Sequence, residues 1–347
     1  MLNPFDNMYS LEDKIKYINF LEGDLNEVNY SEYLSLLEEC ANAGSEDSAI
    51  KLSEIYRYGD AFTEADESAA IETLKIFFSK SKSSKIAKEI AEIYWLMLDG
   101  TEADSEAYAT EWYKISADLG DGESCERLAQ RYWHAWGCDE NIDDSIRYYE
   151  LAIGYKYTPA NLVLATLYLD DFEDTKKHKD AIKLLQDGSI QDDANCQFLY
   201  ASYLETGEYV AQDDKQAFLW LSKSAAQDNP EAQYKLATNY LTGKGVDKDI
   251  YTAFKWFERS ADNHCQKAQI QLYTSYLCGS GIEKNLTLSF AWLLIAIKNS
   301  WRGSSKDLLS TLVPMSHLLG STLNKDQISR ATKFRDEFVL GNKYRYS

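Results

Sequence analysis

A short motif that returns every 36 residues constrains the fold of this chain more than any other feature. The motif is a small residue, a phenylalanine, a variable residue and a tryptophan, and its three clearest copies begin at Ala217, Ala253 and Ser289. Earlier copies in the same register open with a small residue at Ala181, Ser145 and Ala109. A fixed period of this length is typical of stacked supersecondary units, each of which covers the apolar face of the next. We therefore interpret the chain as a repeat array.

Each repeat also has a first half that reads as a helix followed by a turn. Small and large apolar residues stand at positions i, i+4, i+5 and i+8, which share one helical face. In the clearest copy they are Ala232, Leu236, Ala237 and Tyr240. Gly243 and Gly245 predict a turn with positive φ, and Asp249 stands where an N-cap would begin the second helix. The unit is thus predicted to be an antiparallel helical hairpin, and the chain to be all-α.

The pattern from Ala232 to Ala261 resembles the Sel-one-like repeat (SLR) family, which is related to tetratricopeptide repeats. It reads A-x-x-x-L-A-x-x-Y-x-x-G-x-G-V-x-x-D-x-x-x-A-x-x-W-x-x-x-S-A. The resemblance implies a right-handed α/α superhelix, or solenoid, of about seven hairpins with helical caps. We expect a capping helix in residues 1–30, the repeats in residues 31–300, and capping helices with a short tail in residues 301–347. The glycine turn is lost at Asp170-Asp171-Phe172, which puts the local loop geometry there in question.

The chain is strongly acidic, and its charge limits the classes of partner. It has 36 Lys and Arg against 56 Asp and Glu, a formal net charge of −20 at pH 7. The first 75 residues hold 17 of the acidic and 5 of the basic residues, a net charge of −12. Such a surface repels phosphate groups, so neither a nucleic acid nor an anionic membrane is expected to bind. A basic protein would complement it, although acidic residues also serve solubility.

The sequence contains no recognisable address or cofactor motif. No basic stretch is followed by an apolar one near the N-terminus, and no run approaches the roughly 20 apolar residues of a membrane span. We expect a cytoplasmic, monomeric protein without a cofactor. The six cysteines form no CxxC pair and lack zinc-like spacing, so we expect free, buried thiols.

The four histidines are the first place to look for catalysis, and none lies in an HExxH motif or near an obvious nucleophile. His134 lies in an unusual aromatic stretch, Tyr132–Trp136. One interpretation is an aromatic-lined pocket with a hydrogen-bonding imidazole. The other is the end of a helix, with Trp133 packed and His134 partly solvated. We expect a non-catalytic protein and keep an enzyme with a site near His134 as an alternative.

A partner would bind the face of each first helix that lies opposite the core, where the residue type varies between copies. Aromatic residues beside this face would be interface anchors, or they would pack between hairpins. The candidate partner-binding residues are Glu54, Arg127, Gln130, Trp133, His134, Thr166, Phe198, Ser202, Tyr203, Tyr234, Lys235 and Thr238.

The resemblance implies a non-catalytic scaffold or adaptor that holds a protein or peptide in a concave groove, because SLR proteins commonly mediate protein assembly. The acidic charge favours a sharper alternative. In that interpretation the chain is an intracellular immunity or inhibitor protein that sequesters a basic bacterial toxin or effector.

Overall fold

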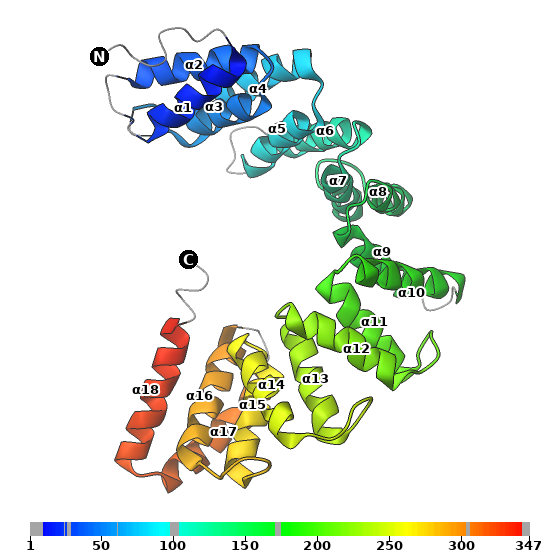
Figure 1. Ribbon diagram of the computed structural model, residues 1–347, viewed down its shortest axis with the longest axis vertical. Helices are drawn as coiled ribbons and strands as arrows, with labels where there is room; N and C mark the ends of the chain where they lie inside the picture. The colour runs from blue at the N-terminus through cyan, green and yellow to red at the C-terminus, as the bar shows by residue number, and fades with distance from the viewer. Residues whose placement is uncertain are drawn as a thin grey trace. The chain divides into compact units, whose positions relative to one another are not determined.

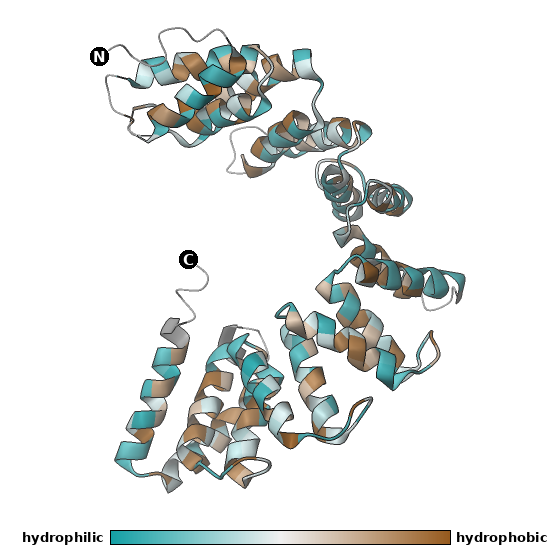
Figure 2. Ribbon diagram, in the orientation of Figure 1, coloured by the Kyte–Doolittle hydropathy of each residue, from teal (hydrophilic) through white to brown (hydrophobic). Residues whose placement is uncertain are grey.

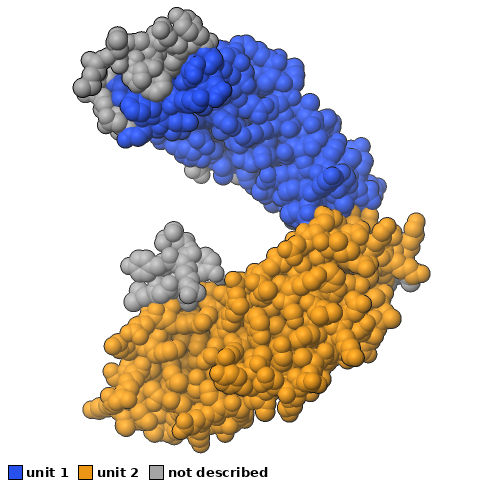
Figure 3. All heavy atoms as spheres, in the orientation of Figure 1, with its two compact units in different colours: residues 1–160 blue, residues 161–347 orange. Residues whose placement is uncertain are grey.

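The computed structural model describes residues 10–23, 25, 29–60, 62–97, 104–170, 175–302 and 306–341. Over these residues the chain forms eighteen α-helices and no strand (Figure 1). The prediction of an all-α chain of helical hairpins is confirmed. The helices fall into two compact units, residues 1–160 and residues 161–347 (Figure 3), and each is described by itself.

In unit 1, helices that follow one another in the sequence pack side by side. They are α1 (Leu11–Glu22), α2 (Tyr30–Asn42), α3 (Glu46–Tyr58), α4 (Glu67–Ser81), α5 (Ser84–Leu96), α6 (Ser105–Asp118), α7 (Gly122–His134) and α8 (Ile142–Gly154). The pairs α3–α4, α5–α6 and α7–α8 are the hairpins. Helix α1 packs on α2, where the buried side chains Ile18 and Leu21 share a core cluster with Tyr33 and Leu37.

Unit 2 begins within α9, and its consecutive helices also pack side by side. Its helices are α9 (Pro159–Leu169), α10 (Thr175–Ile190), α11 (Ala194–Thr206), α12 (Asp214–Ala226), α13 (Pro230–Thr242), α14 (Ile250–Asp262), α15 (Gln266–Cys278), α16 (Leu286–Arg302), α17 (Lys306–Thr322) and α18 (Lys325–Gly341). After the last hairpin, α15–α16, both α17 and α18 pack on α16. Trp292 on α16 contacts Phe334 and Phe338 on α18, with ring centroids 5.7 and 5.4 Å apart.

The 36-residue period is a packing period of the second helices. The small residue that opens the motif is at most 1% exposed in all six copies, namely Ala109, Ser145, Ala181, Ala217, Ala253 and Ser289. One turn later, a large residue is buried in every copy, namely Tyr113, Tyr149, Leu185, Leu221, Phe257 and Leu293. A small side chain lets two helices approach closely, and the large one fills the space beside it. In Figure 2, hydrophobic and hydrophilic residues accordingly alternate along the helices.

The two turn glycines are needed for different physical reasons. Both have positive φ, +83° at Gly243 and +70° at Gly245, as predicted. Gly243 ends α13 as a left-handed cap, and a Cβ there would meet only ordinary contacts. At Gly245 a Cβ would overlap the backbone carbonyl of Asp214, at the start of α12 in the preceding hairpin. The second glycine therefore permits close contact between repeats. Of the turn that replaces these glycines at residues 170–172, only Asp170 is among the described residues.

A ladder of polar side chains also follows the period in unit 2. Fully buried glutamines stand at the same position of three first helices, at Gln197, Gln233 and Gln269. Each donates from Nε2 to the backbone carbonyl eight residues earlier, at 3.1 to 3.2 Å. Each Oε1 accepts a hydrogen bond from a side-chain amide at the end of the second helix that follows. The donors are Gln227, the C-cap of α12, for Gln197; Asn263, the C-cap of α14, for Gln233; and Asn299 of α16 for Gln269. Buried amides are stable in a core only when paired in this way.

Candidate functional site

All twelve candidate residues lie on first helices, and none is fully buried. Glu54 is on α3; Arg127, Gln130, Trp133 and His134 are on α7; Thr166 is on α9; Phe198, Ser202 and Tyr203 are on α11; Tyr234, Lys235 and Thr238 are on α13. Five lie in unit 1 and seven in unit 2, and the structure links only some of them directly. No contact joins Glu54 to the candidates of α7 among the described residues.

Lys235 is the centre of the group in unit 2. Its Nζ donates to Ser202 Oγ at 2.8 Å and to Glu205 Oε2 at 3.0 Å, and lies 5.5 Å from the ring centroid of Phe198. The Glu205 side chain is only 10% exposed and also accepts from Asn239 Nδ2 at 2.9 Å. Lys235 was predicted to bind a partner, but its ammonium group mainly joins α11 to α13. Sequence reasoning missed Glu205.

The remaining candidates of unit 2 mostly make internal contacts. The hydroxyl of Thr166 donates to the Val163 carbonyl, and that of Thr238 to the Tyr234 carbonyl. The ring of Tyr203 lies 5.6 Å from that of Tyr209, and the ring of Tyr234 lies 5.6 Å from that of Phe257. These tyrosines therefore pack beside the core, which was one of the two interpretations of the aromatic residues.

In unit 1 the structure brings Arg127 and Gln130 together at a cavity of about 170 Å³. The other lining residues are Trp95, Tyr113, Arg131 and Trp136. His134 is exposed and stacks on Trp136 with ring centroids 4.5 Å apart, while the indole of Trp133 remains 37% exposed. The aromatic stretch Tyr132–Trp136 thus borders a pocket. Arg131, at the centre of this pocket, was not among the candidates.

Arg131 is a buried cation with incomplete hydrogen bonding. It is 2% exposed. Its Nη1 donates to the Trp136 carbonyl at 3.2 Å and, at 3.4 Å each, to the Glu106 carbonyl and Thr110 Oγ1. Its Nη2 is buried without a hydrogen-bond partner. Burial lowers the pKa of Arg131 from its usual value, although an arginine stays charged at neutral pH. The guanidinium is flanked by Trp95 at 4.5 Å from the ring centroid.

A signal for Arg131 was present in the sequence. Ser124, Leu128 and Arg131 stand at i, i+4 and i+7, so they share one face of α7. The first two are fully buried. A charged residue on a buried face is unusual and marks either an internal ion pair or a site.

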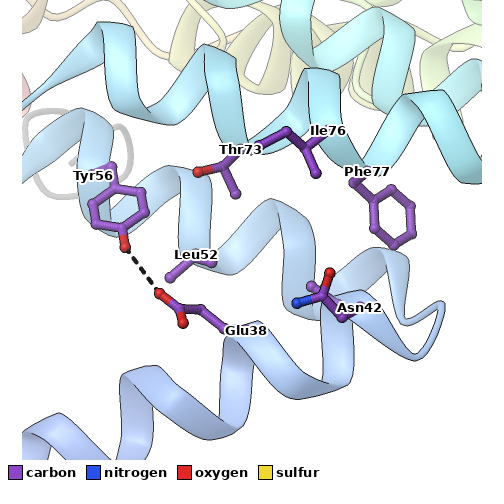
Figure 4. A pocket seen from close by; sticks show the side chains of 8 residues that line it. Glu38, Asn42, Leu52, Tyr56, Thr73, Ile76 and Phe77 are labelled. Atoms are coloured by element: carbon purple, nitrogen blue, oxygen red, sulfur yellow. Dashed lines mark hydrogen bonds between the residues drawn. The ribbon is translucent and has the colours of Figure 1, made fainter.

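A second pocket lies between α2, α3 and α4 (Figure 4). Its volume is about 190 Å³, and Leu52, Ile76 and Phe77 give it an apolar wall. The carboxylate of Glu38 lies at the same pocket and accepts from the Tyr56 hydroxyl at 3.4 Å. Ile76 is 52% exposed. An apolar wall beside a carboxylate suits the stem and charged head of a lysine or arginine side chain.

The cysteines depart in part from the expectation of buried thiols. All six are free. Cys40, Cys125, Cys196 and Cys265 are buried, Cys138 is half-buried and Cys278 is exposed. The expectation is therefore wrong for Cys278, the last residue of α15, because the side chain stands where the helix ends at Gly279.

Within the residues that the structure describes, no group of three or more His, Cys, Asp and Glu side chains is placed to hold a metal ion. No helix in those residues combines the length and the hydropathy needed to cross a membrane.

Comparison with known families identifies the repeat. The Sel1 repeat model matches six segments, residues 46–72, 91–121, 122–153, 194–229, 230–265 and 268–300. These segments make up more than half of the 347 residues and leave out the hairpin α9–α10. No curated protein matches the chain significantly.

Among solved structures similar to this chain, one with a TM-score above 0.5 shows the same fold. A Sel1 repeat protein from Oxalobacter formigenes is 21% identical with a TM-score of 0.58, over 66% of this chain and 94% of that one. A protective antigen of uropathogenic Escherichia coli with an SLR fold is 20% identical with a TM-score of 0.47, over 95% of this chain and 76% of that one. An immunity protein from Pseudomonas aeruginosa is 16% identical with a TM-score of 0.36, over 65% of this chain and 82% of that one.

Proposed function

Because the chain belongs to the Sel1 repeat family, we propose that it is a non-catalytic scaffold that binds a protein or peptide on the first-helix face of its hairpins. One observation carries the proposal. The repeated positions are buried and build the array, whereas the twelve variable candidates all lie on first helices and all keep some exposed surface. We propose a cytoplasmic monomer as its working form.

Capture of the partner tests this proposal. The full chain is immobilised, incubated with a lysate of the source cells, and the bound proteins are identified by mass spectrometry. Trp133→Ala on α7 is compared with Leu151→Ala on α8, since both side chains are large, apolar and about 40% exposed. We expect the first variant to lose a protein that the second retains. Equal capture by both variants contradicts a first-helix interface.

The acidic N-terminal hairpins favour a second candidate, an inhibitor or immunity protein for a basic toxin. The net charge of −12 in the first 75 residues would attract a basic surface, and the pocket beside Glu38 would accept one of its lysine or arginine side chains. A captured basic protein that is released by salt would support this candidate. We expect Glu38→Lys to weaken its capture more than Glu111→Lys, an exposed position on the second helix α6. Recovery of no basic partner at any salt concentration contradicts it.

An enzyme with a site near His134 has less support. The imidazole is exposed, and its ring contact is the stack on Trp136. A clean metal analysis, together with no effect of His134→Ala on any phenotype, would leave this alternative without a basis.

A further inference from the structure

We propose that the cavity around Arg131 is a binding pocket for a carboxylate group, carried by the protein partner as a chain terminus or an acidic side chain. The inference deepens the proposed scaffold function, on which the identity of the carrier rests. The pocket itself rests only on the residues of α5, α6 and α7 and the segment that follows α7.

The first argument is the unbalanced charge of Arg131. Every hydrogen-bond acceptor within reach of its Nη1 is neutral, being two backbone carbonyls and a threonine hydroxyl. No carboxylate in the described part of the chain forms an ion pair with it, and Nη2 has no partner. The Glu106 carboxylate acts on it only at longer range. The rings of Trp95 and Tyr113, at 4.5 and 5.2 Å, partly stabilise the guanidinium. An anion that entered the pocket would add a charge-assisted interaction, reduced by the cost of its own desolvation.

The second argument is the chemistry of the pocket wall. Its polar lining consists of Arg131, Arg127, Gln130 and the phenol of Tyr113, and no acidic residue lines it. Arg127 is 47% exposed and forms a long ion pair with Glu123, 3.8 Å between the closest atoms, so it supplies a second, already paired cation at the surface. All four side chains can donate hydrogen bonds to an anion. The lining therefore selects for negative charge.

The third argument is shape. A planar guanidinium binds a carboxylate through two parallel hydrogen bonds, and the free Nη2 would supply one of them. The indole rings of Trp95 and Trp136, 5.3 Å apart, offer apolar surface to the group that carries the carboxylate. A chain with a net charge of −20 repels polyanions, so we favour a single carboxylate over the phosphates of a nucleic acid.

The test uses the full chain and small probes. N-acetyl-Ala-Phe with a free carboxylate is titrated into the protein, and binding is followed by calorimetry and by the tryptophan fluorescence, to which Trp95 and Trp136 contribute. The same dipeptide with a C-terminal amide is the matched control, and benzoate separates a free organic acid from a peptide terminus. We expect the acid to bind at least about tenfold more tightly than the amide, because a hydrogen-bonded charge pair in a buried site is worth at least 1.4 kcal/mol.

A variant then assigns the effect to Arg131. Arg131→Met keeps much of the volume and removes the charge, whereas Arg147→Met removes an exposed arginine of α8 that pairs with Asp144. We expect the first to abolish the preference for the acid and the second to leave it intact. The comparison of acid with amide in the unaltered chain holds even if Arg131→Met fails to fold. Equal binding of acid and amide, absence of binding by both acids, or a preference that persists in a folded Arg131→Met would overturn the proposal.

Discussion

Asn263 donates a hydrogen bond from Nδ2 to Gln233 Oε1 at 3.0 Å, and this bond joins the residue that caps α14 to the first helix of the same hairpin. Gln233 in turn donates from Nε2 to the Ala225 carbonyl and to Asp228 Oδ1, each at 3.1 Å. The buried amide is thus satisfied on both sides and connects α13 to the end of α12. Equivalent bonds at Gln197 and Gln269 make this a repeated device.

We predict that Gln233→Leu destabilises the array although it adds an apolar side chain to a buried position. The change removes the hydrogen bonds of Gln233 to the Ala225 carbonyl, to Asp228 and to the Asn263 amide, at a cost of about 0.5–1.5 kcal/mol per bond. The Ala225 carbonyl keeps its bond from the Asp228 N–H, and the Asn263 amide keeps its bond to Asp228 Oδ1. The midpoint of urea denaturation, followed by circular dichroism, should fall accordingly. Gln216→Leu, at an exposed position of α12, is the control and should change the midpoint little. An unchanged midpoint for Gln233→Leu would show that the ladder contributes nothing to stability.

Two ion pairs of unit 2 allow a direct comparison of burial at nearly equal distance. Lys235 and Glu205 are 3.0 Å apart with side chains 31% and 10% exposed, and Lys267 and Glu231 are 2.9 Å apart with side chains 64% and 41% exposed. Solvent screens the second pair more strongly. We expect a double-mutant cycle with Lys235→Met and Glu205→Gln to give a coupling energy of about 1 kcal/mol or more.

The same cycle with Lys267→Met and Glu231→Gln should give less than about 0.5 kcal/mol, as exposed pairs do. The measurement is again urea denaturation, made at low and at high salt. A coupling energy for Lys235 and Glu205 as small as that of the exposed pair, below about 0.5 kcal/mol, would mean that Lys235 does not hold α11 and α13 together and is free to bind a partner.

The sequence predicted the repeating hairpins and missed most of the side-chain contacts between them, including the repeated glutamine bonds. The hairpins follow from local physics, since Ala253 must be small, Gly245 must lack a side chain and Asp249 accepts hydrogen bonds from the first turn of α14. Lys235 and Ser202 were both expected on the variable face of a first helix, and in the structure a hydrogen bond joins them. The hydrogen bonds of Lys235 to Ser202 and Glu205 depend on side-chain conformations in two helices, which the spacing of residues in the sequence does not determine.

Arg131 was missed for a different reason. The helical period places it on the buried face of α7, but the candidates were sought on the opposite, solvated face. Its neighbours at the cavity come from three segments, with Trp95 on α5, Tyr113 on α6 and Trp136 after α7. A constellation that depends on tertiary contacts between hairpins becomes visible only in the folded chain.

We predict that the cysteines react with a thiol reagent in the order of their exposure. Burial raises the pKa of Cys125 to about 11 and that of Cys196 still further, so neither forms much thiolate at about pH 8, the form that reacts. Cys278 is exposed and should be alkylated first by iodoacetamide, followed by the half-buried Cys138. Peptide mass spectrometry after short exposures of the folded protein gives the order.

Cys278→Ser is the control for this labelling experiment, because it should remove the fastest phase and leave the others unchanged. Labelling under denaturing conditions should make all six thiols react alike. Early modification of Cys125 or Cys196 in the folded protein would contradict the burial of these side chains.

The two turn glycines give the sharpest test of how neighbouring repeats pack. Both have positive φ, so alanine at either position carries a backbone strain of about 1–2 kcal/mol. At Gly243 the added methyl meets only ordinary contacts, the nearest being Lys248 Cβ at 3.6 Å. At Gly245 it would overlap the Asp214 carbonyl, which is backbone and cannot rotate away. We therefore expect Gly245→Ala to lower the free energy of unfolding by about 1–3 kcal/mol more than Gly243→Ala.

Urea denaturation of the two variants measures this difference, and each serves as the control for the other. Since the overlap lies between the turn of one hairpin and the start of the preceding second helix, its relief would require the two repeats to separate. Gly245→Ala should therefore also increase hydrogen exchange at the amides near Asp214, which Gly243→Ala should leave unchanged. Equal destabilisation by the two substitutions would mean that backbone strain alone explains both glycines, and that the close contact at Asp214 is not required for stacking.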